Sequence, residues 1–236
     1  MTEQHQRPDE TSDRIVMLGV NGGPVLAPDE AKPALALVVN DAVYLIDCGL
    51  DTSRQLLNAK LGFAGIRGIF ITHHHLDHTS GLPGLLLHGW TARPPLPAVD
   101  IWGPPGAKQK ATNLLAGFED EIALFQAGGG FGNFTAPAGH DVEVPLDGGI
   151  VPVMDDDNVR VDATRVFHGP EVADAYAYRF SIKKTGKVIV FSGDTAAHDV
   201  NLAAIARDAT CWSTKRRTTT PSSALQPDFP TPVGRS

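Results

Sequence analysis

The apolar residues of this chain are concentrated in short runs, and turn-forming residues separate the runs from one another. Runs rich in Val, Ile and aromatic residues, bounded by Gly, Pro, Asn or Asp, are typical of β-strands. In one such region the turn pair Asn40-Asp41 divides two apolar runs and predicts a hairpin. Strands are predicted at 14–18, 34–39, 43–46, 68–71, 99–102, 141–144, 159–167, 176–182 and 187–191.

Helices are predicted where apolar side chains recur at helical spacing between these runs. Residues 52–61 carry leucines at this spacing, after Asp51 or Thr52 as a cap. Further helices are expected at 85–90, 108–125 and 200–207, of which the second is long and amphipathic. Strands in two clusters with helices between them predict an α/β (α+β) fold with two sheets faced by helices. The pattern alone does not separate this arrangement from another α/β layer fold.

Length and composition predict one intracellular domain. A chain of 236 residues can bury a large core as one unit, so we expect a domain at 14–208 between disordered tails at 1–13 and 209–236. We find no signal peptide and no apolar stretch of membrane-spanning length, which predicts a cytoplasmic protein with no membrane partner. Cys48 and Cys211 are the only cysteines and favour a reducing compartment. The net charge of −7 argues weakly against a large nucleic-acid surface.

The segment from Thr72 to His78 carries the most chemical information. Residues 73–78 have the pattern His-x-His-x-Asp-His, and the segment directly follows the apolar run 68–71. Neutral imidazole is the commonest metal ligand, and a neighbouring carboxylate suits zinc or a similar divalent ion. A histidine-rich surface loop is the alternative, but the fixed spacing of the donors favours a metal site. The closing Asp-His pair follows so closely that it points apart from the first two histidines, which makes two metal ions plausible.

This motif and its flanking segments resemble the metallo-β-lactamase superfamily, and the flanking segments narrow the resemblance to the branch that includes ribonuclease Z. The matching segments occur in family order and cover about residues 14 to 208. They are 18–24, 45–49, 69–72 with the motif, 81–86, 102–106, 167–169, 178–180 and 190–195. The resemblance implies the αββα four-layer sandwich of this superfamily.

The resemblance also implies the ligands of a centre with two divalent ions, zinc first, with manganese or iron as alternatives. The first ion takes the two leading histidines of the motif and a later strand-end histidine. The second takes the Asp-His pair that closes the motif, and a later aspartate bridges both ions. The implied ligands are His73, His75, Asp77, His78, His168 and Asp194, of which Asp77 and Asp194 are assigned catalytic roles. Without this context, His168 would read equally well as an ordinary strand-end histidine and Asp194 as a turn residue.

Other polar residues near these segments are expected outside the ligand set. Asp47 is predicted to orient a ligand, with a strand-end turn residue as the alternative. Cys48 reads as a small buried hydrophobic residue, and His74 is expected to point away from the metals. The acidic run 155–158 reads as a solvated turn in preference to a calcium site.

The predicted site indicates hydrolysis of an ester. Two divalent ions activate water at neutral pH and can clamp the attacking and leaving oxygens of a phosphodiester, so a binuclear-zinc phosphodiesterase is the favoured reading. Sulfate ester, lactone or β-lactam hydrolysis would use similar machinery and stays open.

Two departures from ribonuclease Z change the expected substrate and activity. The long arm with which that enzyme grips tRNA would fall between 178–180 and 192–195, where this chain has only 181–191, a hairpin's length. A small ester or phosphodiester is therefore the better expectation, while tRNA and a second copy of the chain stay open as partners.

The second departure lies after residue 208. There the family continues with a strand, a His-Glu-Ala-Thr segment, a helix and a last metal-binding histidine, whereas no histidine follows His198 here. We therefore expect the final strand and helix to be missing and the second metal site to be weakened. As a hypothesis, residues 210–216 reread in another frame give Asp-Val-Leu-Val-His-Glu-Ala, which would make the tail a truncation or frame shift. A catalytically impaired metal-binding relic and an iron-dependent redox relative are the alternatives to an active hydrolase.

Overall fold

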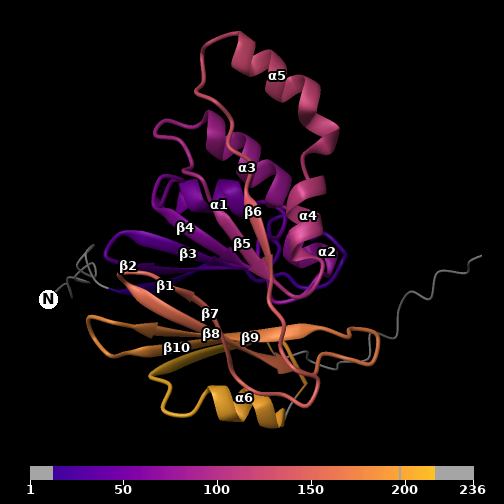
Figure 1. Cartoon of the computed structure of the whole chain (residues 1–236), viewed down its shortest axis with the longest axis vertical. Coiled ribbons are helices and arrows are strands. Elements are labelled where there is room, and N and C mark those ends of the chain that lie inside the picture. The colour runs from indigo at the N-terminus through magenta and orange to yellow at the C-terminus, as the bar shows by residue number, and fades with distance from the viewer. Residues whose placement is uncertain (1–12, 197, 216–236) are drawn as a thin grey trace, which may run out of the picture.

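Two β-sheets face each other at the centre of the molecule, and helices cover their outer sides (Figure 1). The computed structural model describes residues 13–196 and 198–215. The first sheet has the order β1-β2-β3-β4-β5-β6 and the second the order β11-β10-β9-β8-β7. The predicted αββα sandwich is therefore confirmed.

The first sheet begins as an antiparallel meander and continues as parallel strands. β1 pairs antiparallel with β2, and β2 with β3, whereas β3 to β6 pair in parallel. Asn40 and Asp41 both have positive φ values, 48° and 62°, as a tight hairpin turn between two twisted strands requires. The strands are β1 (Arg14–Gly19), β2 (Ala34–Val39), β3 (Ala42–Ile46), β4 (Ile66–Phe70), β5 (Asp100–Gly103) and β6 (Ala138–Asp141).

The second sheet is antiparallel except at β11, which pairs in parallel with β10. Its strands are β7 (Val151–Asp155), β8 (Val159–Val166), β9 (Ala175–Ile182), β10 (Val188–Asp194) and β11 (Cys211–Lys215). The helices of the molecule are α1 (Thr52–Asn58), α2 (Leu76–Thr79), α3 (Leu82–Thr91), α4 (Ala107–Asn113), a short 3₁₀ turn η1 (Ala116–Phe118), α5 (Glu119–Ala127) and α6 (Val200–Ile205).

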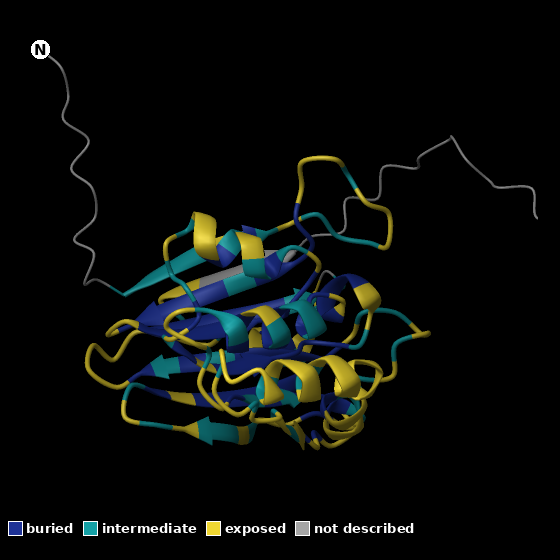
Figure 2. Ribbon diagram, turned by 90° about the horizontal axis from the view of Figure 1, so that it is seen from above, coloured by how far each residue is buried: buried dark blue, intermediate teal, exposed yellow. Residues whose placement is uncertain are grey.

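Alternation along the strands divides the buried side chains among three layers. In β3, Val43 and Leu45 pack under α1 and α3, while Tyr44 and Ile46 pack between the sheets. Phe70 of β4 lies at the centre of the intersheet layer. A third, smaller cluster fills the space between the second sheet and α6. Figure 2 shows the same division, with buried strands inside and exposed faces on the outer helices.

Three predictions about the elements were wrong. The long helix expected at 108–125 is divided into α4, η1 and α5, because α4 buries Ala107 and Ala111 whereas α5 has no fully buried residue to stabilise it as one continuous element. β6 lies three residues earlier than the predicted strand 141–144, and Val142 and Val144 after it pack in the intersheet layer. β7 was not predicted.

The C-terminal part of the domain also differs from the prediction. The tail expected from residue 209 begins with β11, so the strand expected to be missing is present. β11 forms because β10 offers an unpaired edge, and Thr210 N–H donates to Val188 O at 2.8 Å as the two strands join. The proposed frame shift concerns residues that extend to Arg216, and 216–236 lie outside the described residues. Among the described residues, no helix is long and apolar enough to cross a membrane.

Candidate metal centre

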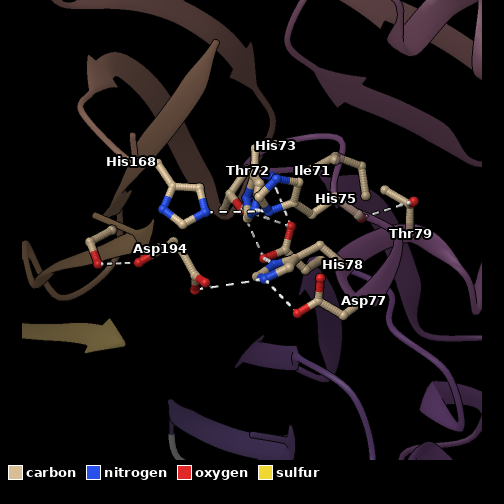
Figure 3. Close-up of polar contacts among 12 residues, drawn as sticks. Ile71, Thr72, His73, His75, Asp77, His78, Thr79, His168 and Asp194 are labelled. Carbon is tan, nitrogen blue, oxygen red and sulfur yellow. Dashed lines mark hydrogen bonds and ion pairs between the residues drawn. The ribbon is translucent and has the colours of Figure 1, made fainter. Parts of the chain in front are cut away.

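The histidine motif lies where the two sheets meet, at the end of β4. Tyr176 N–H of β9 donates to Thr72 O at 2.8 Å, and the Tyr178 hydroxyl donates to Ile71 O at 2.9 Å. Gly193 has a φ of +59°, and a Cβ there would lie 2.7 Å from the Thr72 side chain, so only glycine lets β10 pass this close. The ends of β4, β8 and β10 therefore bring residues far apart in sequence into one site (Figure 3).

The first group of donors consists of His73, His75 and His168. His73 Nε2 lies 3.0 Å from His75 Nδ1, and His168 Nε2 lies 3.3 Å from the same atom. Neighbouring ligands of a tetrahedral zinc ion, with bonds of about 2.0–2.1 Å, are roughly 3.3 Å apart. These two distances are close to that spacing, and all three nitrogens lie within 4.8 Å of one another, so the group could hold one such ion.

The second group consists of His73, His78 and Asp194, whose donor atoms lie within 4.8 Å of one another. His78 Nε2 is 3.6 Å from Asp194 Oδ1 and 3.6 Å from Asp77 Oδ2, which is too long for a hydrogen bond. This buried nitrogen has no hydrogen-bond partner among the described residues. A buried polar atom that faces two carboxylates without a hydrogen bond fits a metal ligand.

Asp47 fixes the orientation of both buried histidines. Its Oδ2 lies 2.7 Å from His78 Nδ1, and its Oδ1 accepts the Thr72 N–H at 2.8 Å. The Thr72 hydroxyl donates to the same carboxylate, so the contact of 3.0 Å between Thr72 Oγ1 and His73 Nδ1 requires that Nδ1–H donates. Both imidazoles therefore turn Nε2 toward the other donors, as metal ligands do. The predicted orienting contact of Asp47 is confirmed, whereas the part of Thr72 was not predicted.

Burial and neighbouring charges shift the pKa values of His73 and His78 in opposite directions. Burial, followed by the positive charge of His78, lowers the pKa of His73 to about 2. Burial also lowers the pKa of His78, but the charges of Asp47 and Asp194 outweigh it and raise this pKa to about 9. Burial lowers the pKa of His168. These shifts favour a doubly protonated, positively charged His78 in the metal-free site. A metal ion that binds His78 Nε2 must therefore displace the proton on that nitrogen.

Asp77 lies beside the second group and is held by a distant loop. Its Oδ2 accepts the Gly23 N–H at 2.6 Å and lies 3.6 Å from His78 Nε2. Lys32 is fully buried and donates to Gly23 O at 2.7 Å and to Val25 O, so its ammonium ties this loop to the site. Nothing in the sequence indicated the parts of Gly23 and Lys32, because Gly23 and Asp77 are 54 positions apart.

The residues predicted to lie outside the ligand set have other surroundings in the structure. His74 turns Nε2 toward the carbonyls of Pro104 and Pro105, 3.2 Å from each. Cys48 is completely buried, and burial raises the pKa of its thiol to about 12, so at neutral pH the side chain is an uncharged thiol that packs as a small hydrophobic residue. In the acidic run, Asp156 accepts the N–H groups of Asn158 and Val159, as expected of a turn.

Comparisons with known proteins identify the family. The family described as "Beta-lactamase superfamily domain" matches residues 43–227. Ribonuclease Z from Mycolicibacterium paratuberculosis is 30% identical over 183 residues, which cover 77% of this chain and 62% of that protein. The chain thus spans less than two thirds of the length of this curated relative.

Two solved structures share the fold. The crystal structure of human tRNase Z, short form, has a TM-score of 0.62 and 24% identity, and the match covers 85% of this chain and 76% of that one. The structure of Zn(2+)-bound PqqB from Methylobacterium extorquens has a TM-score of 0.60 and 12% identity, with 85% and 71% covered. With the family match over 43–227, these findings show that the chain belongs to the metallo-β-lactamase superfamily, among relatives of ribonuclease Z.

Proposed function

We propose that this protein is a metal-dependent hydrolase of ester bonds, and that its substrate is a phosphodiester. The observation that carries the proposal is the arrangement of two adjoining donor groups, in which the inward-facing histidine nitrogens are set by hydrogen bonds on their outer sides. The name ribonuclease Z, borne by the relative described above, supports a phosphodiester over a sulfate ester or a lactone.

His73, His75 and His168 would hold one divalent ion, and Asp77 and His78 a second, with Asp194 reaching both. Bound zinc, or another divalent ion, would supply positive charge that acidifies a water molecule and offsets charge on phosphate oxygens. The Asp194 carboxylate lies within 4.8 Å of the donor nitrogens of His73 and His78, where it would orient the attacking water and accept its proton. Asp47 would keep His78 in the tautomer that leaves Nε2 free of a proton when metal binds.

The substrate proposed is smaller than a folded tRNA. β9 and β10 are joined by a tight turn, and Ile182 N–H donates to Lys187 O at 2.8 Å across it. A tight hairpin thus occupies the position at which ribonuclease Z has its long inserted arm. The β9–β10 connection therefore offers no extended element that could bind a second region of a large RNA.

The first experiment is elemental analysis of the full-length protein, purified without an affinity tag, together with hydrolysis of bis(p-nitrophenyl) phosphate. About two metal ions per chain and turnover that a chelator abolishes are expected. His168→Ala should lose metal and activity, whereas His140→Ala, at an exposed histidine that bonds Asp100, should retain both. One ion per chain without turnover would refute the hydrolase and favour a metal-binding relic.

A further inference from the structure

A shallow cavity lies beside His74 of the histidine motif, at helix α4. It has a volume of about 340 Å³ and is lined by His74, Gly106, Gln109, Lys110 and Asn113. The His74 ring forms one wall because its Nε2 is held by the carbonyls of Pro104 and Pro105. Adjacent histidines of the motif therefore face two different sites: His73 and His75 belong to the donor groups, and His74 lines this cavity.

Lys110 gives the cavity its charge. Its side chain is partly buried, and burial lowers its pKa. Arg165 and Lys183, for comparison, have carboxylate partners in Asp174 and Asp155. Within the described ranges, by contrast, Lys110 has a single polar contact, 3.3 Å from Nζ to Thr79 Oγ1, and no acidic partner. A partly desolvated ammonium without a carboxylate partner is available to pair with an anion from outside.

The remaining lining residues suit an oxyanion. Gln109 and Asn113 supply carboxamide groups next to the ammonium, and the lining contains no carboxylate. Gly106 has a φ of +101°, and a Cβ there would come within 3.5 Å of His74 Nε2, so glycine leaves this side of the cavity open. An ammonium with flanking amide donors is a common way to bind a phosphate group.

A chain of hydrogen bonds connects the cavity to the metal centre. Thr79 Oγ1 accepts a hydrogen bond from the Lys110 ammonium and donates one to His75 O, each at 3.3 Å. Figure 3 shows Thr79 on the far side of His75 from His168 and Asp194. His75 is exposed, so a substrate bound at the donor groups could continue past it toward Lys110 without crossing a buried segment.

We propose that this cavity is a phosphate subsite, which binds the phosphate group next to the scissile one in a nucleotide substrate of at least two phosphates. The inference rests on the proposed phosphodiesterase function for the identity of the substrate, but not for the binding of phosphate. Lys110 supplies the charge, and Gln109 and Asn113 the hydrogen bonds.

Binding is tested first, without turnover, on the full-length metal-loaded protein. Inorganic phosphate is titrated while the backbone amide signals of Gly106, Gln109 and Asn113 are followed by NMR. Lys110→Met should weaken binding at these signals at least tenfold, and Lys110→Arg should restore most of it. Lys108→Met removes an equal charge from an exposed position of the same helix and should change binding less than twofold. Signals that do not move, or equal binding by Lys110→Met, would overturn the subsite.

Turnover then identifies the source of the phosphate. The kcat/KM for 5′-phosphorylated dithymidylate is compared with that for bis(p-nitrophenyl) phosphate, which has a single phosphate group. Lys110→Met should raise KM for the dinucleotide at least tenfold and leave the single-phosphate substrate unchanged. An unchanged KM for both, with phosphate binding lost, would overturn the substrate assignment and indicate a site for free phosphate. Absence of turnover with intact phosphate binding would refute the phosphodiesterase and leave the anion site standing.

Discussion

Replacement of Asp47 by asparagine removes the negative charge of this side chain and keeps its size and shape, so the variant isolates the effect of the charge on metal binding. Asp47 has a φ of +60°, a conformation that asparagine tolerates, and it is buried beneath the motif. The carboxamide oxygen can still accept the Thr72 N–H. Its amide group, however, would donate to His78 Nδ1, which forces the proton of the neutral imidazole onto Nε2.

Two effects of this change oppose each other, and pH decides which is larger. In the wild type, metal must displace a proton from His78, whose pKa is about 9, so at pH 7 the affinity is about 100-fold below its limit. Without the charge of Asp47 this pKa falls toward its ordinary value, and the competition with protons nearly disappears at pH 7. Loss of a carboxylate that orients a metal-bound histidine costs about 10–100-fold in affinity. We therefore expect Asp47→Asn to bind zinc as tightly as the wild type or up to about tenfold more tightly at pH 7, and about 10–100-fold more weakly above pH 9.

The assay is zinc binding to the metal-free protein at free zinc concentrations buffered by a chelator, from pH 6.5 to 9.5. Asp100→Asn is the matched control, because Asp100 makes the same kind of contact with His140 on the exposed edge of the first sheet. It should match the wild type at every pH. A deficit of Asp47→Asn that does not vary with pH would show that His78 is not protonated in the metal-free site, and would refute the reasoning.

Three further predictions concern stability and the loop at Gly23. Phe70→Ala should lower the free energy of unfolding by about 3–5 kcal/mol in urea, since the ring is fully buried and packs on Trp102 and Phe180 at centroid distances of 4.9 and 5.0 Å; a loss below about 1 kcal/mol would contradict this intersheet packing. Lys32→Met should speed proteolysis of the 20–30 loop and weaken the metal site at Asp77 about tenfold, whereas Lys184→Met should do neither; unchanged proteolysis would mean that the ammonium does not hold the loop. The raised pKa of His78 should stabilise the metal-free protein by on the order of 3 kcal/mol below pH 6.5, and this contribution should be lost as pH rises through 9. Unfolding in urea with a chelator at pH 6 and pH 9.5 tests this, and Asp47→Asn should lack the difference.

The sequence by itself determined most of the strands and the position of the principal donors. The apolar run 43–46 marked a strand and the pair Asn40-Asp41 marked the hairpin before it, because both signals depend only on neighbouring residues. The motif from His73 to His78 predicted a metal site, because the spacing of its donors is also a local signal. His168 and Asp194 could be added only through resemblance, because neither carries a local signal of its own.

Tertiary structure decided everything that depends on contacts between distant segments. The division of the long helix at 108–125 followed from which of its turns found a surface to pack on. β11 formed because β10 offered an edge, although the sequence of the segment reads as an irregular tail. The pKa of His78, the bond between Gly23 and Asp77 and the isolation of Lys110 likewise arise from groups that only the fold brings together. Periodicity encodes which face of an element is buried, but it does not encode which partner lies across from it.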